Sequence, residues 1–375
     1  MSTRQRCWVE SMKKTHSSDC KRLIFFSRDL TIGGMEKALV CLLNALSKQN
    51  HQITLVLEKK DGVLLEQLDK NISVKEYSLS QCSFIPLRKL INLFHRVFWG
   101  IFHYHRYDFS CNYATYSVIG SKLALIASKN SALYVHSNYP AMYQGAQAAV
   151  TQFFNTICID SFQHIIFVSN EGMEATRNYF PSLSSRFTVI NNLVDYSLIL
   201  REAEKECNVF GSENVNFLFV GRLDDSSKNF DLLIDSFKAA YKQSGNIRLV
   251  IVGDGPDRLK IQNRISREQI KGIHLLGETP NPYPFIKKCD CMILTSKYEG
   301  YPVVYTEALV FNKPFITTVP VSDDFIDVRN HFVICRPDHC EIADEMLKTQ
   351  KSKLDYQIDF EIANTSRIEQ IEKLF

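Results

Sequence analysis

The sequence predicts an α/β protein with two doubly wound domains facing each other across a cleft. Its 375 residues exceed the length at which one hydrophobic core usually divides into two. Short β-rich apolar runs alternate with helical stretches, a pattern typical of parallel βαβ units. The pattern is lost over 192–214 and starts again at 215, which gives two halves of similar size.

The elements expected in the first half begin with the strand RLIFF and the amphipathic helix that follows it. The expected strands are 22–26, 52–58, 131–136, 164–169 and 187–191, and the first helix covers 33–49. We expect residues 1–20 to be an N-terminal extension, 21–195 to form the N-terminal domain and 196–214 to be a linker.

The second half repeats the order of strand, helix and strand. Its expected strands are 215–221, 246–253, 271–277, 290–296 and 314–319, with helices at 229–243 and 256–266 and another carrying Glu307. This domain is expected over 215–350, with a charged helical tail over 351–375.

Composition places the chain among ordinary globular proteins, with 45% apolar and 23% charged residues. The first twenty residues contain no apolar core of a signal peptide, and no apolar run reaches the ~18 residues of a spanning helix. Eleven scattered cysteines indicate free thiols in a reducing compartment. A cytoplasmic location is therefore expected, with no nucleic-acid partner.

Charge is unevenly distributed along the chain. Residues 1–200 hold 21 lysines and arginines against 14 acidic residues, whereas the remainder holds 23 against 27. A basic first half suggests contact with an anionic surface, although chance can produce an imbalance of this size.

Two carboxylates mark the most informative segment, SKYEGYPVVYTEALVF (296–311). Glu299 follows an apolar strand, Pro302 suits the first turn of a helix, and Glu307 lies inside that helix. Ligands bind at strand ends of open α/β sheets, and helix N-termini favour anions. Carboxylates that hold hydroxyl groups beside a phosphate-binding helix end suit a nucleotide-sugar, whereas an isolated pair would more simply be surface residues.

Three further strand-to-helix junctions carry candidate groups. Gly221 precedes Arg222 and Lys228, two cations that can hold a diphosphate and stabilise it as a leaving group. Gly253 ends the next strand and permits close backbone approach. The alternatives are surface charges and a plain turn.

In the first half, Gly33 and Gly34 lie between a strand and a helix, where their amides can face a phosphate or an acceptor sugar. The spaced G-x-G-x-x-G dinucleotide motif is absent there, and the alternative is a plain tight turn between strand and helix. His136 ends an apolar strand and can form a hydrogen bond with a substrate hydroxyl. The alternative is a structural histidine whose hydrogen bonds are made within the protein.

Together these motifs resemble the retaining glycosyltransferases of family four, which have the two-domain GT-B fold. The likeness spans 22–335 and is most specific over 277–318. The hallmark of that family is two glutamates separated by seven residues, and Glu299 and Glu307 match it. The other matching positions are Arg222 and Lys228, Gly33 and Gly34 with Glu36 following, His136, and the hinge-side Asn192 and Asp195.

The resemblance implies roles for these residues. Glu299 would contact the donor sugar and Glu307 the ribose, while Arg222 and Lys228 neutralise the departing diphosphate. His136 would act beside them, without a metal or cofactor. The remaining donor-binding positions implied are Gly221, Gly253, Gly300, Tyr301, Pro302 and Val303.

The implied reaction moves a sugar, with retention, from a UDP-linked donor to a glycan or lipid-linked acceptor in bacterial surface-polysaccharide synthesis. A departure is the loop PVSDDFID (320–327), which lacks a glycine common in the family. The alternatives are a non-catalytic scaffold subunit that binds nucleotide-sugar and a GT-B epimerase or phosphorylase.

Two other segments have competing interpretations. Residues 87–106 form a basic amphipathic helix that could lie on an anionic membrane at the inner face, but we expect it to be buried as a helix of the first domain. His331, Cys335, His339 and Cys340 lie close in sequence without a clean zinc spacing, so we expect no metal site there.

Overall fold

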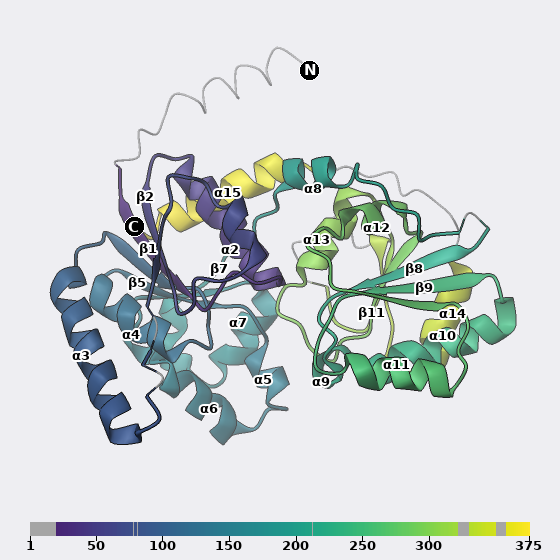
Figure 1. Cartoon of the computed structure of the whole chain (residues 1–375), viewed down its shortest axis with the longest axis horizontal. Helices are drawn as coiled ribbons and strands as arrows, with labels where there is room; N and C mark the ends of the chain where they lie inside the picture. Colours follow the sequence, from purple (N-terminus) through teal and green to yellow (C-terminus); the bar gives the residue numbers. More distant parts are fainter. Residues whose placement is uncertain (1–19, 78, 81, 212, 322–329, 350–357) are drawn as a thin grey trace, which may run out of the picture.

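The computed structural model describes residues 20–77, 79–80, 82–211, 213–321, 330–349 and 358–375. Two α/β domains, each with one fully parallel sheet, lie side by side (Figure 1). The predicted fold class is therefore confirmed. Expectations for the extension before residue 20, most of the loop 320–327 and residues 351–357 fall outside the described residues.

The N-terminal sheet has seven strands in the order β3-β2-β1-β4-β5-β6-β7. Their bounds are Arg22–Ser27 (β1), Gln52–Leu57 (β2), Ser73–Glu76 (β3), Phe109–Asn112 (β4), Ser131–Val135 (β5), His164–Phe167 (β6) and Phe187–Val189 (β7). The strand order reverses between β1 and β4. These two strands pair in parallel, with Leu23 opposite Phe109.

The C-terminal sheet has six strands in the order β10-β9-β8-β11-β12-β13. Their bounds are Val215–Val220 (β8), Ile247–Val252 (β9), Ile273–Gly277 (β10), Cys291–Leu294 (β11), Phe315–Thr317 (β12) and Phe332–Ile334 (β13). Here the reversal lies between β8 and β11, so both domains have the same winding.

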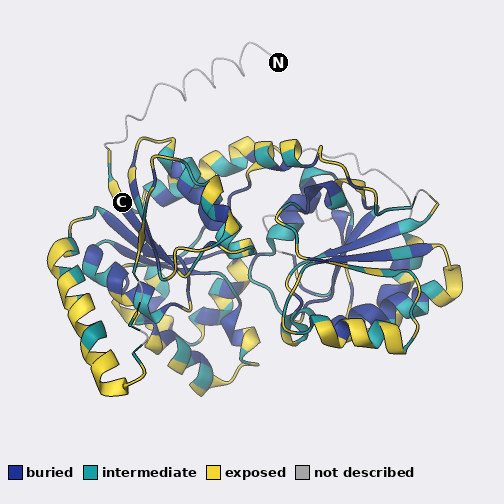
Figure 2. Ribbon diagram, viewed as in Figure 1, coloured by how far each residue is buried: buried dark blue, intermediate teal, exposed yellow. Residues whose placement is uncertain are grey.

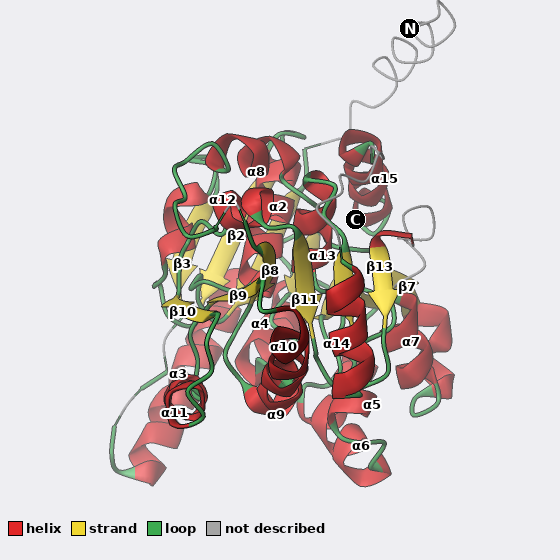
Figure 3. Ribbon diagram, turned by 90° about the vertical axis from the view of Figure 1, so that its right-hand side faces the viewer, coloured by secondary structure: helices red, strands yellow, loops and turns green. Residues whose placement is uncertain are grey.

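Helices cover the faces of both sheets (Figure 3). Those of the N-terminal domain are α2 (Gly34–Ser47), α3 (Ile85–His103), α4 (Val118–Ala127), α5 (Tyr139–Met142), α6 (Gln147–Thr156) and α7 (Asn170–Arg177). Those of the C-terminal half are α8 (Tyr196–Glu202), α9 (Asp225–Lys228), α10 (Phe230–Ser244), α11 (Arg258–Arg267), α12 (Tyr283–Lys288), α13 (Val303–Val310), α14 (His339–Lys348) and α15 (Phe360–Glu372).

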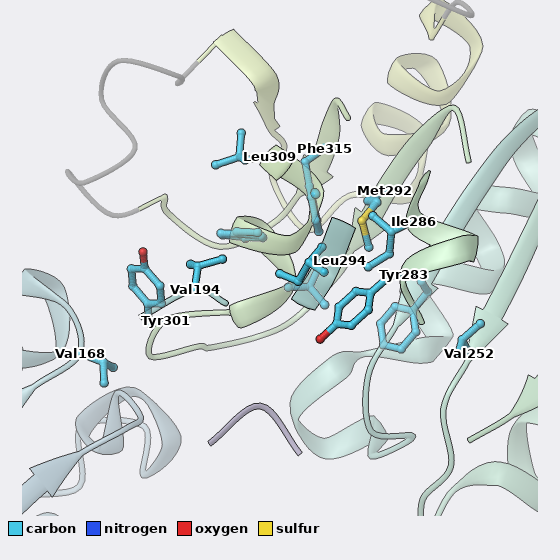
Figure 4. Packing of buried hydrophobic residues seen from close by; sticks show 14 of the residues in the cluster. Val168, Val194, Val252, Tyr283, Ile286, Met292, Leu294, Tyr301, Leu309 and Phe315 are labelled. Carbon is cyan, nitrogen blue, oxygen red and sulfur yellow. The ribbon is translucent and has the colours of Figure 1, made fainter. Parts of the chain in front are cut away.

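The hydrophobic core explains why the strands form where they do. Most of the strands inside each sheet, such as β1 and β9, are apolar on both faces, as sheets covered by helices on each side require. One buried cluster runs from the C-terminal domain through the junction to Val168 and Val194, with Tyr301 among its members (Figure 4). The domains therefore share a continuous apolar contact at the hinge.

The segment between the domains is more ordered than a plain linker. It contains α8, whose first turn is capped by the Asp195 carboxylate accepting from the Leu198 amide at 2.9 Å. The terminal helix α15 then returns from the second domain to pack on α2 of the first. Its Asn364 side chain bonds both the amide and the carbonyl of Val194.

The strands predicted in the sequence are all present, and each of their ends lies within two residues of the predicted position. The sequence interpretation missed β3, β4 and β13, which have three or four residues each. β3 is a polar edge strand and β4, FSCN, has mixed polarity, so neither carries the apolar run used to recognise strands.

The expectation that residues 87–106 form a buried helix is wrong. The helix exists as α3, but no residue within it is buried, and Figure 2 draws it as mostly exposed with intermediate residues between. It contacts the domain through a narrow inner edge, where Trp99 packs edge-on against Phe26 with ring centroids 5.9 Å apart. None of the described helices is both long and apolar enough to cross a bilayer.

Candidate active site between the two domains

The candidate residues gather where the two sheets present their carboxyl ends to each other. Gly221 and Arg222 follow β8, and Glu299 lies on the loop after β11. These two strands flank the reversal of strand order, where open α/β sheets bind ligands. Glu307 occupies the second turn of α13, as the sequence predicted.

Lys228 and Glu299 form an ion pair, although 71 residues separate them. The Lys228 ammonium donates to Glu299 Oε1, which also accepts from Ser296 Oγ at 2.6 Å. Both side chains are less than one-fifth exposed. Lys228 is placed by α9, which begins where Asp224 caps the Ser226 amide.

Glu307 is paired across the cleft with Lys37 of α2, at 3.3 Å between Nζ and Oε1. The Glu307 side chain is only 5% exposed, so this ion pair is almost removed from water. The Lys37 ammonium also lies 5.1 Å from the centre of the Tyr283 ring. Burial, and then the charge of Glu307, raises the pKa of Tyr283 and keeps its hydroxyl protonated.

The N-termini of α2 and α13 approach each other across the cleft. A Cβ atom on Gly34 would lie 3.5 Å from Val303, the first residue of α13. First-turn amides have no intrahelical acceptor, and helix starts carry partial positive charge, so the space between them favours an anion. Pro302 is the N-cap residue of α13, one position before the expected first turn.

Glu36 lies in the first turn of α2. Its carboxylate folds over Gly33, where a Cβ atom would be 2.0 Å from Glu36 Oε2. Burial raises the pKa of Glu36, and the positive charge of Arg222 on the facing domain acts in the opposite direction. Arg222 is exposed and makes no ion pair with any described residue.

Gly300 brings the Glu299 loop into contact with the other domain. A Cβ atom at this position would lie 2.1 Å from the His136 carbonyl oxygen and 2.9 Å from the Ser137 Cα. Backbone atoms cannot yield to such a clash, so only glycine lets the loop pack here. The neighbouring Tyr301 is buried at the hinge, where its hydroxyl lies 3.5 Å from Arg367.

His136 stacks on Tyr134 with ring centroids 4.8 Å apart and also contacts Tyr113. Burial lowers its pKa to about 3, against an opposing hydrogen bond with the Tyr113 backbone. The imidazole is therefore neutral near pH 7. Its Nε2 is buried and has no hydrogen-bond partner among the described residues, so a ligand hydroxyl could bond it only if the contacts that cover it opened.

A small pocket of about 50 Å³ lies beside Glu299, between the domains. Its walls include Ala141, Ser169 and Glu171 of the N-terminal domain, facing residues 297–300 and 319–320. Burial raises the pKa of Glu171, whose carboxylate accepts from Asn138 Nδ2 at 3.2 Å. Ligand sites usually enclose about 300 Å³ or more, so a sugar bound here has to displace the ion pairs or widen the cleft.

Two candidates have structural explanations. Gly253 has φ of +150°, and a Cβ atom there would lie 1.9 Å from the Gly221 carbonyl oxygen, so the two turns pack backbone to backbone. Asn192 is buried at the hinge, and its carbonyl accepts from Arg367 at 2.8 Å. A ligand-lining role for Gly253 stays a prediction, and Asn192 lies at the hinge, where the family resemblance placed it.

The segment 331–340 brings three potential ligands together at the surface, Asp338, His339 and Cys340. They are consecutive and exposed, and Asp338 accepts from the Cys340 and Glu341 amides as the N-cap of α14. Capping explains this carboxylate without a metal.

The sequence interpretation missed Lys37 and Glu171. A sequence signal existed for both residues. Lys37 directly follows Glu36, and Glu171 lies two residues past the end of a predicted strand. Neither position shows from spacing alone which domain it faces.

Two family models together cover most of the chain. "Glycosyltransferase Family 4" matches residues 32–198, and "Glycosyl transferases group 1" matches residues 214–351. The chain belongs to glycosyltransferase family 4. The boundary between the two matches falls in the segment that contains α8.

The chain matches several curated glycosyltransferases over alignments of different lengths. It is 29% identical over 159 residues to an uncharacterised glycosyltransferase of Methanocaldococcus jannaschii, an alignment spanning 41% of this chain and 39% of that protein. The chain spans 35–40% of the length of the first three curated relatives it matches.

A longer match is to the GalNAc-alpha-(1->4)-GalNAc-alpha-(1->3)-diNAcBac-PP-undecaprenol alpha-1,4-N-acetyl-D-galactosaminyltransferase of Campylobacter jejuni. It is 25% identical and spans 77% of each chain.

Solved glycosyltransferase structures share the fold. Anabaena Alr3699/HepE in complex with UDP superposes with a TM-score of 0.71 at 18% identity, over 94% of this chain and all of that one. TarM of S. aureus in complex with UDP, with a TM-score of 0.68 at 12% identity, covers 94% of this chain and 96% of its own. At these identities the likeness establishes the GT-B fold expected from the sequence.

Proposed function

We propose that this family 4 member transfers a sugar, with retention of configuration, from a UDP-sugar to a lipid-linked or glycan acceptor during surface-polysaccharide synthesis. The observation that carries the proposal is the Lys228–Glu299 pair at the reversal of strand order, facing the other domain. UDP occupies structural neighbours, and the Campylobacter relative is named for an undecaprenyl-diphosphate-linked acceptor. A cytosolic location is part of the proposal.

In the proposed ground state, the donor diphosphate lies at the start of α13, beside Arg222 and Lys228. Glu307 accepts hydrogen bonds from the ribose, and Glu299 holds the sugar hydroxyls. Because both carboxylates are paired with lysines, the donor has to compete for them. Neutral His136 accepts from or donates to a sugar hydroxyl without adding charge.

In the proposed reaction the bond from the anomeric carbon to the diphosphate oxygen breaks. The acceptor oxygen forms its bond to the same carbon from the same face, and the acceptor proton passes to the departing oxygen. The two cations stabilise the negative charge that develops on the diphosphate. They supply positive charge without a metal, so transfer is expected to persist in EDTA.

The test begins with saturation-transfer NMR against a panel of UDP-sugars and proceeds to transfer with the donor that binds. Glu299→Gln should lower kcat by about 100-fold or more, since it removes a charge positioned at the reacting carbon. The control Glu213→Gln changes an exposed loop carboxylate and should leave kcat unaltered. An unchanged rate for Glu299→Gln would refute the assignment.

The product distinguishes the alternatives. Retention requires the same anomeric configuration in donor and product, read from the NMR coupling of the anomeric proton. Donor binding without turnover over a broad acceptor panel would indicate a scaffold subunit. Nucleotide release without a glycosylated acceptor would indicate an epimerase, and dependence on inorganic phosphate a phosphorylase.

A further inference from the structure

Helix α3 carries its apolar side chains outward. The exposed side chains recur every three or four residues and so share one face. This face holds Leu87 (45% exposed), Leu90 (48%), Phe94 (65%), Val97 (52%), Phe98 (64%) and Ile101 (66%), and Ile85, Leu93 and Phe102 of the same helix are exposed as well. A surface helix normally buries such a face, and a contiguous exposed apolar patch marks an interaction site.

The opposite edge of α3 attaches it to the domain through polar and aromatic groups. Asn92 accepts from the Ser80 amide at 2.8 Å. Trp99 packs edge-on against Phe26 and Tyr77, with ring centroids 5.9 and 6.4 Å apart. These contacts fix the rotation of the helix, so the outward position of the apolar face is set by the fold.

The surroundings of this face are basic. Between Glu76 and Asp108 the chain has no acidic residue, but it has Arg88, Lys89, Arg96 and Arg106. Arg88 and Lys89 are exposed on the first two turns of the helix. An apolar face bordered by cations fits the interface of an anionic bilayer, where apolar burial and attraction to lipid headgroups add together.

We propose that α3 docks the N-terminal domain on an anionic membrane, lying in the plane of the lipid headgroups with its apolar face inserted. No described helix can span a bilayer, so contact of this kind would be peripheral. α3 lies on the side of the N-terminal domain away from the C-terminal domain (Figure 1). Docking through α3 therefore leaves the pocket beside Glu299 uncovered. The inference does not depend on the proposed reaction.

A second copy of the chain fits the same face less well. Symmetric dimers bring the same patch of each subunit together. That arrangement would place the basic segment of one α3 against that of its partner with no acidic residue from 77 to 107 to offset it. Anionic headgroups supply the missing negative charge.

The test is co-sedimentation of the full chain with vesicles. Vesicles of equimolar phosphatidylcholine and phosphatidylglycerol should bind it, whereas phosphatidylcholine alone should bind at least tenfold less (~fivefold per basic residue at the surface). Binding to the mixed vesicles should weaken as salt rises.

Two double variants separate the apolar and electrostatic contributions. Phe94→Asp with Phe98→Asp should abolish binding, and Arg88→Glu with Lys89→Glu should reduce it more than about 20-fold. The matched controls are Leu259→Asp on α11, which is 71% exposed, and Lys242→Glu with Lys271→Glu, both exposed and in the other domain. The controls should bind as the unaltered chain does.

Hydrogen exchange gives a readout that does not depend on variants. Vesicles should slow exchange of the α3 amides and leave those of α11 unchanged. Equal binding by the α3 variants and the unaltered chain would overturn the proposal, as would absence of binding to mixed vesicles. A dimer in solution that the Phe94 and Phe98 changes convert to monomer would assign the face to a second copy instead.

Discussion

At the scale of single residues, His136 is a histidine that stays neutral well below the usual pKa of about 6.5. Its pKa of about 3 is lower in the folded than in the unfolded chain, because burial disfavours the charged ring. The folded state therefore loses stability as pH falls below 6.5, until the folded pKa is reached.

His136→Phe should remove this dependence while keeping a ring between Tyr113 and Tyr134. Between pH 7 and pH 5, the free energy of unfolding should fall by about 2 kcal/mol less in the variant than in the unaltered chain. Urea unfolding at both pH values measures this. An equal fall in both proteins would mean that the buried imidazole accepts a proton in the fold.

Glu171 is the residue that should separate acceptor from donor binding. It lies on the N-terminal wall of the pocket beside Glu299. Glu171→Gln should lower kcat/KM for the acceptor about tenfold by weakening one hydrogen bond to a hydroxyl, with the Kd for UDP unchanged. Glu174→Gln, one turn further along α7 and 55% exposed, is the control. A matching loss of UDP affinity would place Glu171 on the donor side.

At the scale of elements, the contact between α2 and α13 is held by the Lys37–Glu307 pair. Lys37→Met would leave the nearly buried Glu307 carboxylate without its cation, at a cost of about 2 kcal/mol in the free energy of unfolding. Urea unfolding measures the loss, and Lys48→Met at the exposed end of the same helix should cost almost nothing. If both variants unfold alike, the pair contributes no stability.

At the scale of the whole molecule, α15 ties the second domain back to the first. Asn364 bonds the hinge backbone at Val194, and Arg367 bonds it at Asn192. At the far end, Glu372 pairs with His51 at 3.0 Å, and Phe375 packs on Phe109. We therefore expect the angle between the domains to depend on a helix distant in sequence from the hinge.

Asn364→Ala should loosen the hinge without unfolding either domain. Hydrogen exchange of the Val194 amide should accelerate about tenfold, since it loses its hydrogen bond. Thr365→Ala alters the neighbouring exposed side chain, which bonds only within α15, and should leave the hinge unchanged. Unaltered exchange at Val194 would show that the apolar contacts alone hold the junction.

Much of the fold could be predicted because strands buried on both faces are continuous apolar runs, such as RLIFF and IRLVIV. The strands with mixed polarity were missed for the same reason. The α3 prediction failed because periodicity reports that a helix has an apolar face, but not which way the rest of the chain turns that face.

The candidate site also contains residues that the sequence could predict and residues that it could not. Spacing within one segment predicted Glu299 on a loop and Glu307 inside a helix, and both positions are confirmed. Lys37 and Glu171 could not be identified, because their importance comes from contacts across the cleft with the other half of the chain. Such contacts depend on the relative placement of two domains, which no local pattern encodes.

The return of α15 has a consequence for recombining this protein with its relatives. An acceptor specificity transplanted by exchanging residues 20–195 alone would leave the recipient's last helix against a foreign surface, with Phe375 and Glu372 mismatched to their partners. A chimera with two crossovers would take residues 358–375 from the same parent as the N-terminal domain. Such a chimera would keep the contacts of Glu372 and Phe375 with that domain. Even then, the backbone around residue 136 must keep its present position. The loop at Gly300 packs so closely against the carbonyl of residue 136 that a shift of this carbonyl would produce a clash.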